Sequence, residues 1–292
     1  MTPTAANTGK LIPMTQPIPL IDHVIVNARD ALDDAAALWT RLGFQLTPRG
    51  HHTLGSSNNL AILGTDYIEL LGVMPENAGR GDVLVWPAGL NGLVFKTTDS
   101  DGVYARMAEA GAPVLPPQSF SRPVDMGEGR IGEAAFRTVR LEQDASPAGR
   151  MFFCHHMTPD LVWHDPWRHH PNAAVGIDGM VIAAEDPEVY AALFALMFGE
   201  SRVRHAGFTA SLVAGLATIE VMTPAAVAER FGAAAPDLAG RPYAMAALMV
   251  RTAGFVHALA ALAAGGFDAA PVDGAITIPA SQAGGLVLQF VE

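Results

Sequence analysis

The stretch LIDHVIVNARDALDDAAALWTRLGFQL (residues 20–46) decides the fold, because it reads as a strand, a helix and the start of a second strand. Residues 20–26 are mostly apolar, as in a buried strand. The helix has one apolar stripe at helical spacing, made by Ala35, Leu38, Trp39 and Leu42. Gly43 then ends the predicted helix. His23 interrupts the apolar strand, and a buried imidazole of this kind needs a partner.

The same order of elements recurs along the chain, and an internal repeat of this kind defines the architecture. The later copies begin at LNGLVFKTT (90–98), VGIDGMVIAA (175–184) and AMAALMVRT (244–252). A helix and two or three strands follow each of them. One such unit cannot cover its own sheet, so the units must pair. The sequence therefore predicts an α+β protein in which four βαβββ units pair into two curved-sheet barrels.

The predicted division of the 292 residues follows from these repeats. We expect a flexible N-terminal arm over residues 1–19 and a first domain over residues 20–165. A linker rich in Pro, Trp and His occupies residues 166–172, and a second domain covers residues 173–292. Half of the residues are hydrophobic and 16% are charged, so the chain can bury a sizeable core.

The formal net charge of −11 disfavours binding to nucleic acid or to an anionic membrane surface. No apolar run approaches the roughly 20 residues that span a bilayer. The first 19 residues lack the apolar segment of a secretory signal. The single cysteine, Cys154, excludes an intrachain disulfide and is consistent with a reducing cytoplasm. We expect a cytoplasmic monomer or homodimer that acts on a small molecule.

Metal ligation by the first domain is the strongest chemical prediction. Glu69 stands alone in the apolar run DYIELLGV (66–73), as His23 does in its strand. Both strands are predicted to line one cavity, in which His23 and Glu69 would point inward together. The third ligand should come from RMFFCHH (150–156), where His156 lies on the inner face and His155 is the alternative. Two histidines and one carboxylate suit a divalent metal, namely iron, zinc, manganese or nickel.

The second unit of the first domain carries fewer ligands in this interpretation. Gly92 stands where the first unit has His23, and Cys154 aligns with Glu69. The second domain is degenerate, since Gly179 replaces the strand histidine while Glu220 and Gln289 keep the last-strand positions. A carboxylate and an amide without imidazoles make a poor site for a transition metal.

The stretches IDHVIVNARDALDDAAALWTRLGF, YIELL and FFCHHMTPDLVW resemble the vicinal oxygen chelate superfamily, which includes glyoxalases, bleomycin-resistance proteins and extradiol dioxygenases. The resemblance is greatest to its glyoxalase-like branch, and it covers most of residues 20–165. It implies that each pair of units forms a glyoxalase-like barrel that holds a divalent metal. It also favours His156 as a ligand, because that branch has a comparable FFC-x-H stretch.

The resemblance implies a metal-dependent enzyme of the glyoxalase or dioxygenase type, which polarises a small oxygen-bearing organic molecule by Lewis-acid chemistry. Glu69 would be the catalytic residue, either as a ligand or as a base. Tyr67, Cys154 and Arg137 are the predicted substrate-binding residues. The alternative is a non-catalytic protein of the bleomycin-resistance type that sequesters a small molecule. In that case His23 and Glu69 bond each other.

Other residues have simpler interpretations from the sequence. His51 and His52 are predicted to lie in a surface hairpin, and Cys154 is predicted to be a buried small side chain. The linker histidines are expected to be solvated; they are His164, His169 and His170. Arg130 and Arg140, like Arg137, could meet an anionic substrate or lie on the surface.

Overall fold

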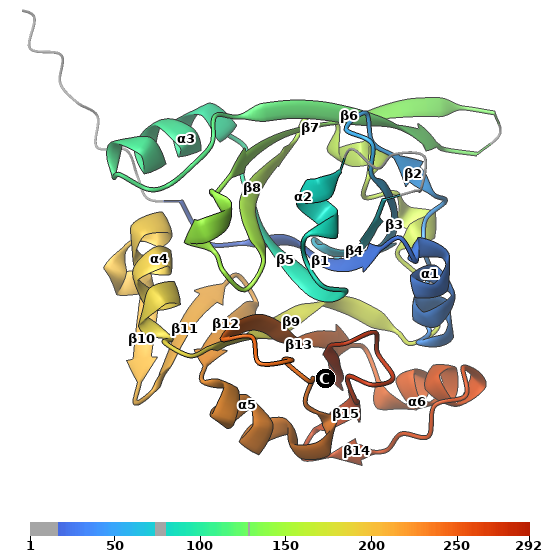
Figure 1. Cartoon of the computed structure of the whole chain (residues 1–292). Coiled ribbons are helices and arrows are strands. Elements are labelled where there is room, and N and C mark those ends of the chain that lie inside the picture. The colour runs from blue at the N-terminus through green and yellow to red at the C-terminus, as the bar shows by residue number, and fades with distance from the viewer. Residues whose placement is uncertain (1–16, 74–79, 128) are drawn as a thin grey trace, which may run out of the picture.

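The computed structural model describes residues 17–73, 80–127 and 129–292 (Figure 1). Most of the predicted N-terminal arm lies outside these residues. The first half of the molecule contains elements β1 to β8 and the second half contains β9 to β16. In the described parts of the chain, no helix is both long and apolar enough to cross a membrane.

The first half is built from two successive strand–helix–strand units. The first unit consists of β1 (Ile21–Arg29), α1 (Leu32–Arg41), β2 (Gly50–His51), β3 (Ser57–Ile62) and β4 (Tyr67–Gly72). The second unit consists of β5 (Gly89–Lys96), α3 (Ser100–Glu109), β6 (Gln118–Asp125), β7 (Ile131–Arg140) and β8 (Arg150–His156). The short helix α2 (Gly81–Leu84) lies between the units. Turns of 3-10 helix follow at Gln143–Ala145, Pro159–Leu161 and Asp165–Trp167.

The second half repeats this plan. Its first unit consists of β9 (Ala174–Ala184), α4 (Glu188–Phe198), β10 (Val203–Ala206), β11 (Thr209–Ala214) and β12 (Ala217–Met222). Its second unit consists of β13 (Tyr243–Thr252), α6 (Phe255–Ala264), β14 (Pro271–Val272), β15 (Ala275–Ile278) and β16 (Val287–Val291). Helix α5 (Pro224–Phe231) connects the units, and 3-10 turns occur at Glu200–Arg202 and Gly232–Ala234.

Each half forms one eight-stranded mixed sheet, and the strand order is the same in both. The orders are β2-β3-β4-β1-β5-β8-β7-β6 and β10-β11-β12-β9-β13-β16-β15-β14. In each sheet the first strands of the two units pair antiparallel at the centre, and each lies parallel to the last strand of its own unit. The predicted α+β fold with four units paired into two curved sheets is confirmed. The predicted boundaries of the two domains stay a prediction.

The register supports the duplication residue by residue. His23 pairs with Tyr67 in the parallel ladder of β1 and β4, two residues before Glu69. Gly179 pairs with Thr218 in the corresponding ladder of β9 and β12, two residues before Glu220. Gly179 therefore occupies the place of His23 in the second half, as the sequence predicts.

The register corrects one correspondence within the first half. Val94, and not Gly92, pairs with Phe152, the residue two positions before Cys154. If Cys154 corresponds to Glu69, the place of His23 belongs to Val94, and Gly92 lies two residues earlier. The conclusion that the second unit has no histidine at this place is unchanged.

The largest hydrophobic cluster lies between the two sheets and joins the halves. Phe198 at the end of α4 packs on Phe95 and Phe153 of the first half, with ring centroids 4.7 and 5.7 Å apart. Phe44 stacks on Phe290 of β16 at 5.9 Å. Each sheet has a second, smaller cluster of buried apolar residues that is separate from this shared core. In the first half, that smaller cluster surrounds the candidate site.

The segment between the halves is more buried than the sequence predicts. His170 was expected to be solvated, but its side chain is buried and bonds the backbone through both ring nitrogens. Nδ1 accepts from the Gln45 N–H at 3.0 Å, and Nε2 lies 2.8 Å from the Ile62 oxygen. Asn172 donates to the Leu42 oxygen at 3.0 Å. These bonds attach the connecting segment to the first half.

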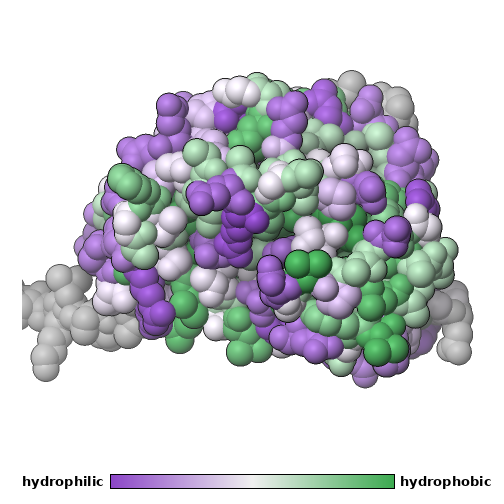
Figure 2. All heavy atoms as spheres, turned by 90° about the horizontal axis from the view of Figure 1, so that it is seen from below, coloured by the Kyte–Doolittle hydropathy of each residue, from purple (hydrophilic) through white to green (hydrophobic). Residues whose placement is uncertain are grey.

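The face of the second half that is seen from below in Figure 2 carries hydrophilic and hydrophobic residues in small interspersed groups.

Candidate functional site

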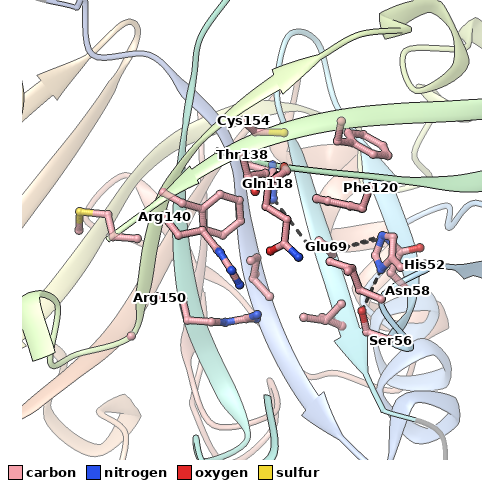
Figure 3. A pocket seen from close by; sticks show the side chains of 18 of the residues that line it. His52, Ser56, Asn58, Glu69, Gln118, Phe120, Thr138, Arg140, Arg150 and Cys154 are labelled. Carbon is pink, nitrogen blue, oxygen red and sulfur yellow. Dashed lines mark hydrogen bonds and ion pairs between the residues drawn. The ribbon is translucent and has the colours of Figure 1, made fainter. Parts of the chain in front are cut away.

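A cavity of about 220 Å³ opens on the inner face of the first sheet. Alternate residues of a strand face the same side, so each strand places every second side chain in the cavity. Residues from β1, β3, β4, β6, β7 and β8 contribute to its lining. Apolar side chains make most of the wall, including Phe120, Phe136 and Phe152. Figure 3 shows polar side chains across this cavity, from Arg140 and Arg150 on one side to His52, Asn58 and Ser56 on the other.

His23 and Glu69 meet inside this cavity, as the sequence predicts. His23 Nε2 lies 3.7 Å from Glu69 Oε2. This separation is too long for a direct hydrogen bond. The two residues are 3% and 7% exposed, so neither is solvated by bulk water. Tyr67, a predicted substrate-binding residue, also lines the cavity and stacks on the His23 ring at 4.3 Å with an interplanar angle of 13°.

The Glu69 carboxylate is held by neighbouring polar groups. Asn58 Nδ2 of β3 donates to Glu69 Oε1 at 2.6 Å. Burial works to raise the pKa of Glu69, but the His23 and His52 imidazoles and the Asn58 hydrogen bond outweigh burial. The pKa of Glu69 therefore lies below its ordinary value. An ionised, fixed carboxylate is the form that binds a cation or removes a proton.

His52 is a member of the site that the sequence interpretation missed. Its Nε2 lies 3.9 Å from Glu69 Oε1, and its Nδ1 lies 3.0 Å from Ser56 Oγ. Burial, with the charges of Arg122 and Arg80, lowers the pKa of His52 to about 4 against the opposing charge of Glu69. The ring is therefore neutral at neutral pH. The predicted surface hairpin is wrong for His52, because this side chain turns into the cavity.

Asp22 is the second residue that was missed. Its fully buried carboxylate lies 2.7 Å from His23 Nδ1 and 2.9 Å from His156 Nε2, both through Oδ1. Burial acts to raise its pKa, but the two imidazoles lower the pKa well below its usual range. An ionised carboxylate only accepts hydrogen bonds, so both rings must donate to it. Nδ1 of His23 is thus engaged by Asp22, and Nε2 faces Glu69.

His156 is bonded to Asp22, and its ring packs against Tyr67, Phe136 and Trp163. His156 therefore lies on the Asp22 side of His23, where both rings bond the same carboxylate. Glu69 faces the other nitrogen of the His23 ring, Nε2. His155, the alternative ligand, pairs with Arg137 and takes the opposite face of β8. His156 shares the face of β8 that carries Cys154, but it does not line the cavity. The group of His23, Glu69 and His156 as three metal ligands stays a prediction.

A second group could hold a metal ion. Within the described residues, the ligand atoms of Asp22, Cys154 and His156 all lie within 4.8 Å of one another. Cys154 lines the cavity and is buried, as predicted, and burial raises the pKa of its thiol well above the usual value. Lys96 Nζ lies 3.9 Å from Asp22 Oδ2 and adds a positive charge beside this group.

Arg137 does not lie where the sequence interpretation placed it. It is absent from the cavity lining, and its Nη2 bonds Asp101 of α3 at 2.6 Å. The phase of β7 explains the error, because Phe136, Thr138 and Arg140 face the cavity while Arg137 faces α3. The prediction that Arg137 contacts substrate is therefore not supported by its position. Arg140 lines the cavity instead.

The corresponding region of the second half has a different character. Glu220 Oε2 accepts from Arg230 Nη1 at 2.6 Å, and Gln289 Nε2 donates to Thr277 Oγ1 at 2.9 Å. Both last-strand residues thus have partners within the protein. Gly179 supplies no side chain at the position of His23. The asymmetry between the halves agrees with the sequence expectation of a degenerate second copy.

Comparison with protein families gives a match to a glyoxalase-like domain over residues 21–198. The chain belongs to this glyoxalase-like domain family. Comparison with curated protein sequences gave no match.

Three solved structures show the same fold at low sequence identity. A hypothetical protein from Staphylococcus aureus matches with a TM-score of 0.65 and 13% identity, over 94% of this chain and 99% of that one. A mutant of 4-hydroxymandelate synthase from Streptomyces coelicolor matches with a TM-score of 0.58 and 13% identity, over 94% and 92%. A xylose isomerase-like TIM barrel/4-hydroxyphenylpyruvate dioxygenase fusion protein matches with a TM-score of 0.56 and 14% identity, over 87% and 40%.

Proposed function

We propose that this protein is a metal-dependent enzyme of the glyoxalase or dioxygenase type, which acts on a small oxygen-bearing organic molecule in the cavity of the first half. The carrying observation is the His23–Glu69 pair, whose Nε2 and Oε2 atoms face each other at 3.7 Å inside an apolar cavity. The similarity to a synthase and a dioxygenase supports the fold alone. Because one fold serves many activities, the function is inferred from the residues of the site.

The residues of the cavity fit a divalent transition metal. His23 and Glu69 would hold it, as the sequence predicts, and His52 is better placed than His156 to supply the second imidazole. His52 Nε2 lies 3.9 Å from the other oxygen of Glu69, while the His156 Nε2 hydrogen is donated to Asp22. Two imidazoles and one carboxylate are a donor set for iron, zinc, manganese or nickel. Such a metal supplies Lewis-acid polarisation of substrate oxygen atoms.

The residues around these ligands have supporting roles. Asp22 fixes the orientation of the His23 ring through Nδ1, and Asn58 fixes Glu69 through Oε1. Partners of this kind orient metal ligands and raise their basicity. Glu69 either stays a ligand or accepts a proton from the substrate, since its Oε2 faces the cavity without a hydrogen bond from Asn58. Tyr67 and Cys154 complete the wall against which the substrate lies.

The group of Asp22, Cys154 and His156 is the competing position for a metal. Asp22 Oδ1 already receives two imidazole hydrogen bonds, and Lys96 Nζ lies 3.9 Å from Asp22 Oδ2. Neither Asp22 nor His156 lines the cavity. For these reasons we assign the catalytic metal to the cavity group.

Elemental analysis of tag-free protein tests this proposal. We expect about one metal ion per chain in the parent, and little or none in His23→Ala, Glu69→Gln and His52→Ala. Cys154→Ser, His156→Gln and Glu220→Gln should keep most of it. Circular dichroism checks that every variant is folded. Loss of metal in Cys154→Ser with retention in Glu69→Gln would move the metal to the competing group, and loss in Glu220→Gln alone would move it to the second half.

The alternative function is sequestration of a small molecule without catalysis. One observation favours it: Asn58 already satisfies Glu69 Oε1, and apolar rings dominate the remaining wall. A parent protein that contains no metal after tag-free purification, and takes up none from added Fe²⁺, Zn²⁺, Mn²⁺ or Ni²⁺, would favour this alternative.

A further inference from the structure

The cavity carries a positive charge that the proposed metal chemistry does not use. Four arginines line it, Arg80, Arg122, Arg140 and Arg150, against two carboxylates, Glu69 and Glu142. This balance is opposite to that of the whole chain, whose net charge is −11. Positive charge gathered in a cleft with low-dielectric walls attracts anions and raises their local concentration.

Among the described residues, Arg122 and Arg140 are the cavity arginines whose side chains have no hydrogen-bond or ion-pair partner. Arg122 lies near the negative charge of Glu69, so Arg140 is the one that remains for a ligand. Its side chain is half-buried on the cavity wall and has no hydrogen-bond or ion-pair partner among the described residues. Its Nε is buried without a partner. A guanidinium in such a position presents a planar fork of donors that matches a carboxylate or a phosphate. Arg137, three residues earlier on the same strand, satisfies its fork with Asp101 instead.

Arg150 strengthens the positive charge at this end of the cavity. It lies on β8, next to β7, where Arg140 pairs with Phe152. Arg140 and Arg150 are therefore diagonal neighbours on the inner face, within reach of each other's long side chains. Figure 3 shows both guanidinium groups on one side of the cavity, with Glu69 and His52 on the other side. Like charges on neighbouring strands repel each other, and an anion between them relieves this repulsion.

The apolar wall of the cavity sets the body of the ligand. Phe120, Phe136 and Phe152 line the cavity, and the first two rings stack with centroids 5.2 Å apart. Aromatic walls of this kind favour a flat apolar group. Arg140 and Arg150 thus make one end of the cavity cationic, and the phenylalanine rings form an apolar wall. His23, His52 and Glu69 lie at the other end, with Arg80 and Arg122 near His52.

We propose that the substrate is an organic anion with an aromatic or similarly flat apolar body, and that Arg140 binds its carboxylate or phosphate. The inference rests on the proposed function in taking the same cavity as the site, and it adds the substrate class and the residue that selects it. The anionic group lies at the end formed by Arg140 and Arg150, so the opposite end of the substrate faces His23, His52 and Glu69.

Isothermal titration calorimetry with three matched probes tests this proposal. Phenylacetate and phenyl phosphate carry the two anions, and phenylacetamide is the neutral analogue. We expect at least one anion to bind at least about tenfold more tightly than the amide, because a charge-assisted hydrogen bond contributes that much. The tighter of the two anions identifies the carboxylate or the phosphate as the natural group.

Variants locate the binding group. Arg140→Met should weaken binding of the preferred anion at least about tenfold, while Arg140→Lys should keep part of the affinity. Arg137→Met is the matched control and should bind as the parent does. Equal affinity for the anions and the amide, no binding of either anion, or parent-like binding by folded Arg140→Met would overturn the proposal. If Arg140→Met does not fold, Arg140→Lys and the comparison of probes still decide it.

The same titrations on protein treated with a chelator separate this proposal from the metal assignment. Anion binding that survives chelation and depends on Arg140 supports the proposal even if the protein proves to lack a metal. Anion binding that is lost on chelation, and is unaffected by Arg140→Lys, would mean that the metal alone binds the anion and would contradict the role of Arg140.

Discussion

Asp22 Oδ1 lies 2.7 Å from His23 Nδ1, on the side of the imidazole ring that faces away from Glu69. A carboxylate in this position fixes both the orientation of the ring and the nitrogen that carries the proton. Since Asp22 also bonds His156 at 2.9 Å, one buried carboxylate orders two of the histidines of the first half. The orientation of the His23 ring toward Glu69 depends on this bond.

Asp22→Asn should weaken metal binding about 10–100-fold, which is the usual effect of removing a partner behind a metal-bound histidine. The variant keeps one oxygen acceptor but loses the charge that stabilises the donated hydrogens. Competition titration against a chelator of known affinity measures the change. Lys96→Met is the control, because it removes a charge 3.9 Å from Asp22 Oδ2 without touching the imidazole bonds. Parent-like affinity in folded Asp22→Asn would contradict this positioning role.

Asp66 gives a prediction on pH. Its buried carboxylate accepts the Ile177 N–H at 3.0 Å, and burial raises its pKa from 3.8 to about 6 despite that bond and nearby Lys96 and Arg251. A raised pKa favours the protonated folded state, so this stability is complete below about pH 4 and is lost as the pH rises through 6. The loss amounts to about 3 kcal/mol above pH 7.

Asp66→Asn keeps the acceptor oxygen but cannot ionise. We expect it to unfold in urea with about 2–3 kcal/mol more free energy than the parent at pH 8, and with almost the same free energy at pH 4. A difference that is equal at both pH values would show that the carboxyl group is not responsible.

The packing of α4 on the first half predicts cooperative unfolding. Phe198→Ala removes a fully buried ring from the shared core and should lower the free energy of unfolding by about 3–5 kcal/mol. Phe208→Ala, at a ring that is 87% exposed, is the matched control and should change it by less than about 0.5 kcal/mol. Both proteins should unfold in one transition by fluorescence and circular dichroism. Two separate transitions in Phe198→Ala, with the first half unaffected, would contradict a shared core.

Gly43 predicts a further stability effect at the contact between the halves. It has a φ of +85°, and a Cβ added there would lie 2.8 Å from the Ala261 Cβ and 2.9 Å from the Asn172 Cβ. Gly111 has a φ of +75° but open space around it. Gly111→Ala should therefore cost about 1–2 kcal/mol from the backbone alone. Gly43→Ala should cost about 1–3 kcal/mol more from crowding. If the two variants lose equal free energy of unfolding in thermal or urea denaturation, the halves are not closely packed around Gly43.

The sequence predicts the fold and one pair of site residues because strand alternation and repetition are local patterns. The apolar strand around His23 and the apolar run around Glu69 each identify a buried strand. Since these strands belong to one unit and lie parallel in the sheet, both residues reach the same cavity.

His52 and Asp22 were not predicted as site residues, because the features that position their side chains leave no periodic pattern in the sequence. His52 follows β2, which has only two residues, so no alternation indicates the direction of its side chain. Asp22 precedes His23 on the strand, and alternation alone would separate them. A register shift between Ile21 and His23 in the ladder with β5 breaks that alternation. The sequence does not show which side chains of β7 face the cavity, so it could not separate Arg137 from Arg140. In the structure Arg137 bonds Asp101 of α3, and Arg140 lines the cavity.

The most direct test of the central claim is an anomalous diffraction measurement on crystals of the tag-free protein, with data collected at the absorption edge of the metal found by elemental analysis. The account predicts one strong peak per chain in the cavity of the first half, bonded to His23 Nε2 and to Glu69. A peak bonded to Cys154 and Asp22, or a peak beside Glu220 in the second half, would contradict it.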